Sequence, residues 1–324
     1  MSDPLLQRAA ALLRPVPDFP KPGILFWDIA PVLRDPEVFS HLLDLMVERW
    51  KDERIDVIAG FDARGFIFGA ALALRMGLPF EQIRKKGKLP GKTRCQWYVL
   101  EYGKAEVEMI DDGFITGKRV LLVDDLLATG GTARAGAELV KEFSGTVAGF
   151  ACVTELPELA GRAQLLDYPV QSLISVIEGK PYIDVEYCVD MLTFDNKTNE
   201  LMLIERLNEP KGLAMPGGHI ERESALAATK RELQEETACT FEPGYCEFFC
   251  VLTKPGRDPR GLKVSYVQLV FCDTSQARAE AGKTRIVKVN RDDGLPERSR
   301  FVLGHAEAVY KCGDVLRHCG LLTA

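Results

Sequence analysis

Short apolar runs alternate with amphipathic stretches through the first half of the chain. Four of these runs predict buried strands, at residues 55–60, 119–125, 146–156 and 170–177. A glycine-containing turn follows each of the first two runs and leads into a helical pattern, at 66–76 and 132–143. Repeated strand–loop–helix units indicate an open parallel sheet with helices on both faces. Ligands of such sheets bind at the carboxyl ends of the strands.

The pattern changes at residues 178–184, where glycine and proline interrupt it. Two apolar runs then flank the turn-rich segment 195–199, which predicts a hairpin. A Gly-Gly turn leads into one strong helical pattern at 223–236, and two further strands and a closing helix follow at 245–252, 263–271 and 305–319. This mixed sheet with few helices is a second fold. We therefore expect two α/β domains, 1–180 and 181–324, with the boundary near Pro181.

Composition agrees with this division and narrows the partners. A chain of 324 residues suits two domains, and 46% hydrophobic with 27% charged residues is an ordinary soluble mixture. The net charge of −6 argues against nucleic acid or an anionic membrane as the main partner. No apolar run approaches the ~20 residues of a membrane span. Small-molecule ligands held by local loops remain the expectation.

The cysteine pattern and the N-terminus bear on location. The nine cysteines are scattered, and a zinc site built on Cys246 and Cys250 would have only His318 and Cys319 as a second ligand pair. Residues 1–19 lack the apolar core and cleavage site of a signal peptide, and Asp3 is placed to cap a first helix. We expect reduced cysteines in a cytoplasmic protein.

The first candidate site is the stretch VLLVDDLLATGGT at 120–132. Apolar residues predict a buried strand that ends at Asp124 and Asp125, and a small glycine-rich loop then begins a helix. Backbone N–H groups of such a loop converge on a phosphate, while the two carboxylates can accept hydrogen bonds from vicinal ribose hydroxyls. Ribose 5-phosphate is the group that fits. An incidental acidic turn would not require all of these features in one register.

This stretch resembles the phosphoribosyl-pyrophosphate signature of type I phosphoribosyltransferases. Four further stretches resemble adenine phosphoribosyltransferase, in that family's order: DFPKPGILFWDIAPVLRDP, AGFDARGFIFG, IRKKGKLPG and YVLEYGKAEVEM. The resemblance covers about the first 180 residues. It implies the family's parallel-sheet fold, conversion of adenine and phosphoribosyl pyrophosphate to AMP and pyrophosphate with Mg²⁺, and a homodimer.

The same resemblance assigns residue roles. Asp124 and Asp125 would bind the ribose, the loop 128–132 the 5′-phosphate, and Arg64 the pyrophosphate after a cis peptide between Ala63 and Arg64. The implied substrate-binding residues are Arg64, Arg84, Lys85, Lys88, Tyr102, Asp124, Asp125, Ala128, Thr129, Gly130, Gly131 and Thr132. Any single lysine in the basic run can equally be a solvated surface residue.

Three positions bear on catalysis and base choice. Residues 91–103 resemble the family's mobile loop, in which Glu101 would assist proton transfer at adenine. Ala128 stands where hypoxanthine- and guanine-specific relatives carry an Asp, which favours adenine. Trp27 replaces the arginine usual in the family, and its ring either stacks on the base or belongs to the core.

The second candidate site lies at 217–239, GGHIERESALAATKRELQEETAC. On a helix, Glu232, Glu235 and Glu236 fall at i, i+3 and i+4 and share one face. Crowded carboxylates of this kind suit Mg²⁺, which bridges to substrate phosphates. A solvated glutamate-rich face is the alternative. The Gly-Gly turn and Glu223 at fixed spacing favour the metal site.

This segment resembles the Nudix box, with Ala238 and Cys239 in place of the usual late glycine and aliphatic residue. The resemblance implies an α/β/α sandwich in which metal-activated water attacks a pyrophosphate. The implied metal ligands are Glu232, Glu235 and Glu236. Arg231 would orient the glutamates, and Arg231, Glu235 and Glu236 are the expected catalytic residues. A general base outside the helix could be Glu280, Glu297 or Glu307.

Substrate choice for the second site rests on KPGRDPRGLKVSYVQLVF at 254–271. This stretch resembles a segment of ADP-ribose pyrophosphatases, and Pro255 lies where many of them have a proline. An ordinary turn would explain the same residues. Hydrolysis of ADP-ribose would give AMP and ribose 5-phosphate, so both halves would produce AMP. The alternatives are an ADP-ribose sensor without catalysis, or hydrolysis of another nucleoside diphosphate derivative or of oxidised dNTPs.

Overall fold

The computed structural model describes residues 3–100, 103–198, 200–289 and 295–318. The chain forms two compact units, Met1–Ile183 and Asp184–Ala324. The boundary expected near Pro181 falls inside a short strand, β10 (Lys180–Tyr182), that pairs with the preceding strand of the first unit. In the described part of the chain, no helix is long and apolar enough to cross a membrane.

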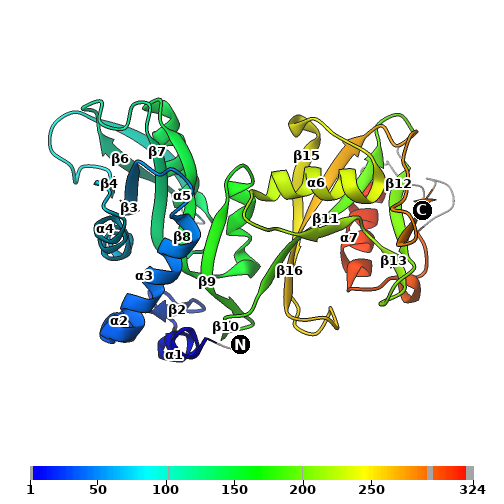
Figure 1. Ribbon diagram of the computed structural model, residues 1–324, viewed down its shortest axis with the longest axis horizontal. Coiled ribbons are helices and arrows are strands. Elements are labelled where there is room, and N and C mark those ends of the chain that lie inside the picture. Colours follow the sequence, from blue (N-terminus) through cyan, green and yellow to red (C-terminus); the bar gives the residue numbers. More distant parts are fainter. Residues whose placement is uncertain (1–2, 101–102, 199, 290–294, 319–324) are drawn as a thin grey trace. The chain divides into compact units, whose positions relative to one another are not determined.

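The described part of the first unit contains one eight-stranded sheet of order β10-β9-β8-β7-β3-β4-β6-β5 (Figure 1). Besides β10, its strands are β3 (Val57–Phe61), β4 (Phe80–Lys85), β5 (Thr93–Leu100), β6 (Gly103–Ile110), β7 (Arg119–Leu127), β8 (Thr146–Glu155) and β9 (Val170–Ile177). The strands from β9 to β4 run parallel, as expected, whereas β10, β5 and β6 pair antiparallel.

Two expectations in this unit need correction. The segment 91–103, expected as a loop, contains strand β5, whose backbone pairs with β6 from Thr93 to Leu100. Strand β7 does not end at the aspartates but continues to Leu127, because its pairing with β8 extends that far. The glycine-rich loop therefore begins only at Ala128.

Helices cover both faces of the sheet (Figure 1). They are α1 (Pro4–Leu12), α2 (Ala30–Leu33), α3 (Pro36–Trp50), α4 (Arg64–Met76) and α5 (Gly131–Glu142), with 3-10 turns η1 (Pro157–Leu159) and η2 (Gly161–Leu165) and a ribbon of β1 (Arg14–Pro17) and β2 (Leu25–Asp28). Successive residues of β7 belong to different hydrophobic cores: Leu121 belongs to the core that includes residues of α1, α3 and α4, and Leu122 belongs to the core that includes residues of α5. Asp3 caps α1 through the Leu6 N–H, as expected.

The second unit contains a mixed sheet, as expected. Its described strands are β11 (Glu186–Asp195), β12 (Leu201–Arg206), β13 (Gly212–Ala214), β14 (Gly217–His219), β15 (Cys246–Leu252), β16 (Lys263–Cys272) and β17 (Thr284–Val289). Strands β11 and β12 form the expected antiparallel hairpin, and β11 pairs in parallel with β16. The Gly-Gly segment, expected as a turn, is the strand β14 and pairs with β11.

Two helices cover opposite faces of this sheet. They are α6 (Ala225–Thr237) and α7 (His305–His318), and two 3-10 turns, η3 (Pro243–Tyr245) and η4 (Arg298–Arg300), join the other elements. Met191 packs with Leu233 of α6, whereas its neighbour Leu192 packs with Val309 of α7. Because adjacent strand residues point to opposite faces, the unit is the expected α/β/α sandwich.

Candidate active sites

An aspartate pair lies near the carboxyl end of β7. Asp125 is buried, and its Oδ2 lies 3.0 Å from Nε of Arg64, the first residue of α4. Asp124 Oδ1 accepts a hydrogen bond from the Asp125 N–H at 2.9 Å. Burial raises the pKa of Asp124, and the neighbouring charge of Asp125 adds to the rise. Burial also raises the pKa of Asp125, although Arg64 opposes it. Hydrogen-bond donors of a ligand would favour the ionised pair.

A glycine allows α4 to begin directly beside these carboxylates. A Cβ atom on Gly65 would lie 2.7 Å from the Val123 carbonyl oxygen and 2.8 Å from Asp124 Oδ1, closer than real Cβ contacts. Strands β3 and β7 are parallel neighbours, so Arg64 and the aspartates meet at one edge of the sheet. The non-proline cis peptide lies between Asp62 and Ala63, one bond before the expected position.

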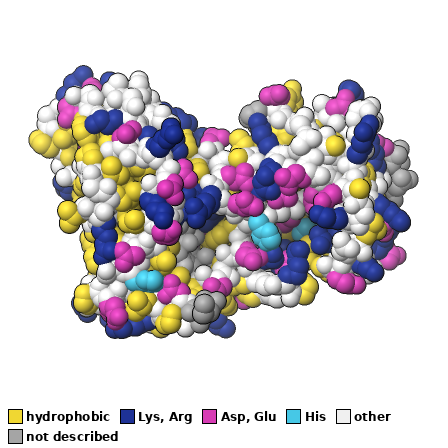
Figure 2. Space-filling view, viewed as in Figure 1, with side chains coloured by type: hydrophobic (Ala, Val, Ile, Leu, Met, Phe, Trp, Pro, Cys, Tyr) yellow, Lys and Arg dark blue, Asp and Glu magenta, His cyan; other side chains and the backbone are white. Residues whose placement is uncertain are grey.

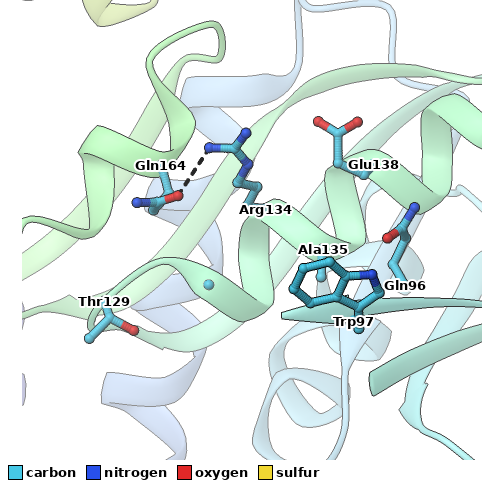
Figure 3. Close-up of a pocket in the computed structure, with 8 residues that line it drawn as sticks. Gln96, Trp97, Thr129, Arg134, Ala135, Glu138 and Gln164 are labelled. Atoms are coloured by element: carbon cyan, nitrogen blue, oxygen red, sulfur yellow. Dashed lines mark hydrogen bonds between the residues drawn. The ribbon is translucent and has the colours of Figure 1, made fainter. Parts of the chain in front are cut away.

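The expected phosphate loop separates β7 from α5. Gly130 caps α5 with a φ of +79°, a left-handed conformation that favours glycine. Thr129 is exposed, and Gly131 and Thr132 are half-buried in the first turn of the helix. The free N–H groups of that turn give the loop the positive end of a helix. A cavity of about 490 Å³ borders the loop, and Figure 3 shows Thr129 and Trp97 at different ends of it.

Of the three expected basic residues, only Arg84 contacts the segment beside Arg64. Arg84, in β4, places Nε 3.3 Å from Asp62 Oδ2 and donates through Nη1 to the Lys88 carbonyl oxygen at 3.1 Å. Its side chain thus lies beside the turn that leads to Arg64. Lys85 and Lys88 are exposed. Their proposed contact with pyrophosphate stays a prediction.

Glu108, which sequence reasoning missed, organises the loop that carries Lys88. It is only 3% exposed and accepts hydrogen bonds from the N–H groups of Lys88 and Leu89 and from the Thr93 hydroxyl. Burial opposes its ionisation, but the N–H donors of the loop outweigh burial and hold the Glu108 pKa below its ordinary value. A glutamate that alternates with apolar residues in a strand is expected to face solvent, so the sequence pattern does not indicate this role.

The residues expected to recognise or act on the base lie in different environments. Glu101 and Tyr102 lie outside the described residues. Trp27 is buried in the core of the first unit, so the core interpretation of this residue is correct and the stacking interpretation is not. Its neighbour Phe26 is half-buried, and the Arg64 guanidinium carbon lies 5.0 Å from the Phe26 ring centroid. Phe26, not Trp27, presents its ring to Arg64, the partner of Asp125.

The second site is organised around Arg231 of α6. Its guanidinium contacts Glu223 Oε1 at 2.7 Å, Glu232 Oε1 at 2.6 Å and Glu235 Oε2 at 3.5 Å. Burial works against its charge, but the hydrogen bonds to Glu223 and Glu232 outweigh burial and raise the Arg231 pKa. Figure 2 shows acidic and basic side chains intermingled in the region of α6. Arg231 therefore contacts two of the three glutamates that it was expected to orient, Glu232 and Glu235, whereas Glu236 accepts the Gly217 N–H.

The three expected metal ligands are not equivalent. Glu232 and Glu236 line a cavity of about 270 Å³, whereas the Glu235 side chain is 58% exposed and is not among its lining residues. Glu236 Oε2 accepts the Gly217 N–H at 2.8 Å. Burial raises the pKa of Glu236 to about 7, and the charges of Glu232 and Asp190 contribute. The inward face of α6 thus carries two of the three glutamates.

Two residues at this cavity, Asp190 and His305, were missed from the sequence, and Arg257 lies in the 254–271 segment but had been given no role of its own. The His305 Nδ1 accepts the Met215 N–H, so the ring proton lies on Nε2, 3.4 Å from Asp190 Oδ2. Burial opposes ionisation of Asp190, but His305 and Arg257 outweigh it and lower the Asp190 pKa. Asp190 and His305 come from distant segments and form no local motif, which is why pattern reading did not find them.

The donor set at this cavity suits Mg²⁺. Asp190 is a buried carboxylate paired with His305 Nε2 at 3.4 Å, Glu232 and Glu236 line the same cavity, and carboxylate oxygens are the ligands that Mg²⁺ prefers. As the side chains stand, no three His, Cys, Asp or Glu residues among those described converge closely enough to hold a metal ion. Arg231 engages Glu232 and Glu235, so a cation would have to displace those contacts.

One candidate base and part of the substrate segment also lie at this cavity. Of Glu280, Glu297 and Glu307, Glu280 lines the cavity together with Glu232 and Glu236, and the other two are exposed outside it. The D-P-R-G segment is a turn in which Asp258 accepts three hydrogen bonds from Arg260. Both residues line the same cavity.

Two protein families match the chain, one over each of its two units. Residues 31–186 match the phosphoribosyl transferase domain family, and residues 186–291 match the NUDIX domain family. The chain is 50% identical over 184 residues to adenine phosphoribosyltransferase of Sorangium cellulosum, covering 55% of this chain and 92% of that protein. It is 50% identical over 178 residues to adenine phosphoribosyltransferase 1 of Triticum aestivum, covering 55% of this chain and 98% of that protein.

Solved structures give the same result for the fold of the first unit. The crystal structure of adenine phosphoribosyltransferase from Thermoanaerobacter pseudethanolicus is 45% identical in sequence and superposes with a TM-score of 0.51. The superposition covers 52% of this chain and 99% of that one. The enzyme from Rhodothermus marinus is 42% identical, with a TM-score of 0.51 over 53% of this chain and 98% of that one. The chain belongs to the adenine phosphoribosyltransferase family and carries a NUDIX domain behind its phosphoribosyltransferase domain.

Proposed function

We propose that the chain is bifunctional and that its first unit converts adenine and phosphoribosyl pyrophosphate to AMP and pyrophosphate. The adjacent carboxylates of Asp124 and Asp125 carry this proposal, because Asp125 is buried and ion-paired with Arg64 and a glycine loop at a helix N-terminus follows the two residues. It supplies acceptors for two ribose hydroxyls and N–H donors for a 5′-phosphate within a few residues.

The reaction joins a ring nitrogen of adenine to C1 of the ribose while the pyrophosphate leaves with the electrons of the bond it formed there. Arg64 stabilises the negative charge of the departing pyrophosphate, and Arg84 adds to it. Glu101 assists removal of the adenine proton, and Tyr102 shapes the closed site. Mg²⁺ would accompany the pyrophosphate, and this sheet edge offers it the carboxylates of Asp124 and Asp125.

The experiment is to incubate the purified full chain with adenine, phosphoribosyl pyrophosphate and Mg²⁺, and to measure AMP and pyrophosphate. The two products should form in equal amounts, and Asp125→Asn should weaken their formation. Glu101→Gln should slow turnover more than it weakens substrate binding. Absence of AMP from the wild-type chain would refute the proposal.

For the second unit we propose hydrolysis of ADP-ribose to AMP and ribose 5-phosphate. Its cavity combines the carboxylates of Glu232 and Glu236 with the cationic side chains of Arg257 and Arg260, which suits a diphosphate held against a metal. Mg²⁺ would be held by Glu232 and Glu236, with Glu235 once it leaves Arg231. When bound, Mg²⁺ supplies positive charge against the pyrophosphate.

Glu280 is the base that we propose for this hydrolysis. A water oxygen bonds to one phosphorus, the bridging P–O bond breaks, and the water proton passes to the Glu280 carboxylate. Its position in the wall of the cavity supports this choice over Glu297 and Glu307. Arg231 positions the glutamates of α6 and does not itself contact the reacting atoms.

Substrate profiling separates the possible functions of the second unit. AMP release should be fastest with ADP-ribose among ADP-ribose, NADH, nucleotide sugars and oxidised dNTPs. Tight ADP-ribose binding without any release would favour a sensor, and preferential cleavage of an oxidised dNTP would favour a nucleotide-pool enzyme. The Glu236 environment supports catalysis, because a sensor needs no half-buried glutamate beside a second carboxylate in its cavity wall.

We further propose that the chain acts in the cytoplasm as a homodimer formed through its first unit. The resemblance of that unit to a dimeric family supports the dimer, and the described cysteines, all of them free thiols, support a reducing compartment. Light scattering of the purified chain gives the assembly state directly. A monomeric mass at working concentrations would refute the dimer.

A further inference from the structure

The 3-10 turn η2 presses against the outer side of the phosphate loop. A Cβ atom on Gly130 would lie 2.3 Å from the Gly161 carbonyl oxygen. A Cβ atom on Gly161 would lie 2.2 Å from the Ala128 carbonyl oxygen. Both glycines are thus in direct backbone contact across the two segments. The loop and η2 fit together only because neither position carries a side chain.

This contact fixes how the loop presents its N–H groups. The Ala128 carbonyl oxygen points toward Gly161, and the N–H of Thr129 belongs to the same planar peptide. In a trans peptide the carbonyl and the N–H point in opposite directions. The Thr129 N–H is therefore directed away from η2. A shift of η2 would release that peptide to rotate.

A buried ion pair holds η2 in this place. Arg162, the residue after Gly161, is 5% exposed, and Glu155 at the end of β8 is fully buried. Arg162 donates from Nε to both oxygens of Glu155, at 2.9 and 3.1 Å, and from Nη2 to one of them at 2.9 Å. Its remaining donors bind the Val170 carbonyl oxygen and the Ser172 hydroxyl. This fork fixes η2 to strands β8 and β9.

A second contact joins η2 to the helix behind the loop. Arg134, in the first turns of α5, donates from Nη1 to the Gln164 side-chain oxygen at 3.2 Å, as Figure 3 shows. Glu155 itself pairs in register with Leu127, the residue that precedes the loop. The loop therefore lies between a strand and a helix that are both tied to η2. Its geometry depends on the Glu155–Arg162 pair.

We propose that the Glu155–Arg162 pair is a positioning device for the phosphate loop and sets its affinity for the 5′-phosphate of the substrate. This inference rests on the proposed function of the loop 128–132. Neither residue contacts the ligand. Loss of the pair lets η2 move, so the loop must reorder its N–H groups when the phosphate binds. Adenine, which the loop does not hold, should be unaffected.

The test uses the full chain and two probes. Ribose 5-phosphate binding is measured by calorimetry, and KM is measured separately for phosphoribosyl pyrophosphate and adenine. Arg162→Gln should weaken ribose 5-phosphate binding and raise the KM for phosphoribosyl pyrophosphate, each by about tenfold, with the adenine KM changed less than about twofold. Arg162→Lys keeps the charge without the fork and should fall between Arg162→Gln and the wild type.

Two further variants keep the test decisive. Gly161→Ala leaves the ion pair intact but places a methyl group against the Ala128 carbonyl, so it should give the same selective loss. Arg119→Gln removes a contact to Glu53 at the opposite end of β7 and should change neither constant. Unchanged ribose 5-phosphate binding in Arg162→Gln would overturn the inference. If that variant does not fold, unchanged binding in Gly161→Ala would do so.

The proposed function and this inference fail separately. A wild-type chain that binds ribose 5-phosphate but makes no AMP refutes the proposed reaction, while the binding of the variants still tests the positioning role. A wild-type chain that makes AMP, with variants that lose thermal stability and kcat but keep both KM values, refutes the positioning role alone. A wild-type chain that makes AMP but does not bind ribose 5-phosphate would overturn the inference and leave the proposed reaction standing.

Discussion

Arg64 and Asp125 form an ion pair at the carboxyl edge of the first sheet, with Arg64 Nε 3.0 Å from Asp125 Oδ2. Arg64 begins the helix after β3, and Asp125 lies near the end of the neighbouring strand β7. The residue expected to bind pyrophosphate and a residue expected to bind ribose thus contact each other directly. Because each side chain holds the other in place, a substitution of either residue should disturb the contacts to both the ribose and the pyrophosphate.

Asp125→Asn should raise the KM for phosphoribosyl pyrophosphate about ten- to hundredfold, since it removes a charged acceptor and frees Arg64. The KM for adenine should change little. Steady-state kinetics with each substrate varied in turn measures this. Asp44→Asn, an exposed residue of α3, is the matched control. Equal losses for both substrates would point to a general structural defect instead.

Adenine should be preferred to hypoxanthine and guanine. Ala128 has no carboxylate to accept a hydrogen bond from those bases, and a site that lacks a required polar partner discriminates strongly. We expect kcat/KM for hypoxanthine to be lower by a factor of at least ~100. Competition between the two bases for limiting phosphoribosyl pyrophosphate gives the ratio directly. Comparable values would contradict the assignment and direct attention to Phe26.

Glu108 should link stability to pH. Its pKa is lowered in the folded state, so its stabilising effect is present above the unfolded pKa and is lost as pH falls through the folded pKa. Glu108→Gln should therefore cost about 1–3 kcal/mol at neutral pH, and the difference from wild type should shrink below about pH 4. Chemical denaturation at several pH values measures it. Glu48→Gln, on an exposed side chain, should show no such trend.

Glu280→Gln should lower kcat for ADP-ribose hydrolysis, by about 10²- to 10⁴-fold for loss of a general base. Its KM should change much less. Glu297→Gln and Glu307→Gln lie outside the cavity and serve as matched controls. A large loss in either control, with Glu280→Gln nearly unchanged, would transfer the role to that control residue.

Local patterns predicted the parts of the fold that are local. The strand–loop–helix units, the hairpin of the second unit and the helix with three glutamates all depend on short-range periodicity. The extent of β7 could not be read in this way, because pairing with β8 carries it past two aspartates that resemble a strand end. The boundary expected near Pro181 lies close to that residue, between Ile183 and Asp184, and pairing of β10 back onto β9 sets its exact position.

The parts of the sites that were missed depend on contacts between distant segments. Asp190 and His305 meet only in the folded second unit, and Glu108 acquires its role only when the loop before β5 wraps around it. Trp27 shows the converse. An aromatic residue in a family motif suggests stacking, yet in this chain packing assigns it to the core. Periodicity identifies faces of elements, whereas which faces meet depends on the whole fold.

The central claim is that one chain carries two independent active sites, and one set of assays tests it. AMP is measured from adenine plus phosphoribosyl pyrophosphate, and from ADP-ribose, on the full-length wild type, Asp125→Asn and Glu236→Gln. Each variant should lose one activity and retain the other within about twofold. Fragments cut between Ile183 and Asp184, which leaves β10 on its sheet, should divide the activities in the same way. A tenfold loss of AMP synthesis in folded Glu236→Gln, about 1.4 kcal/mol in the barrier, would contradict the account.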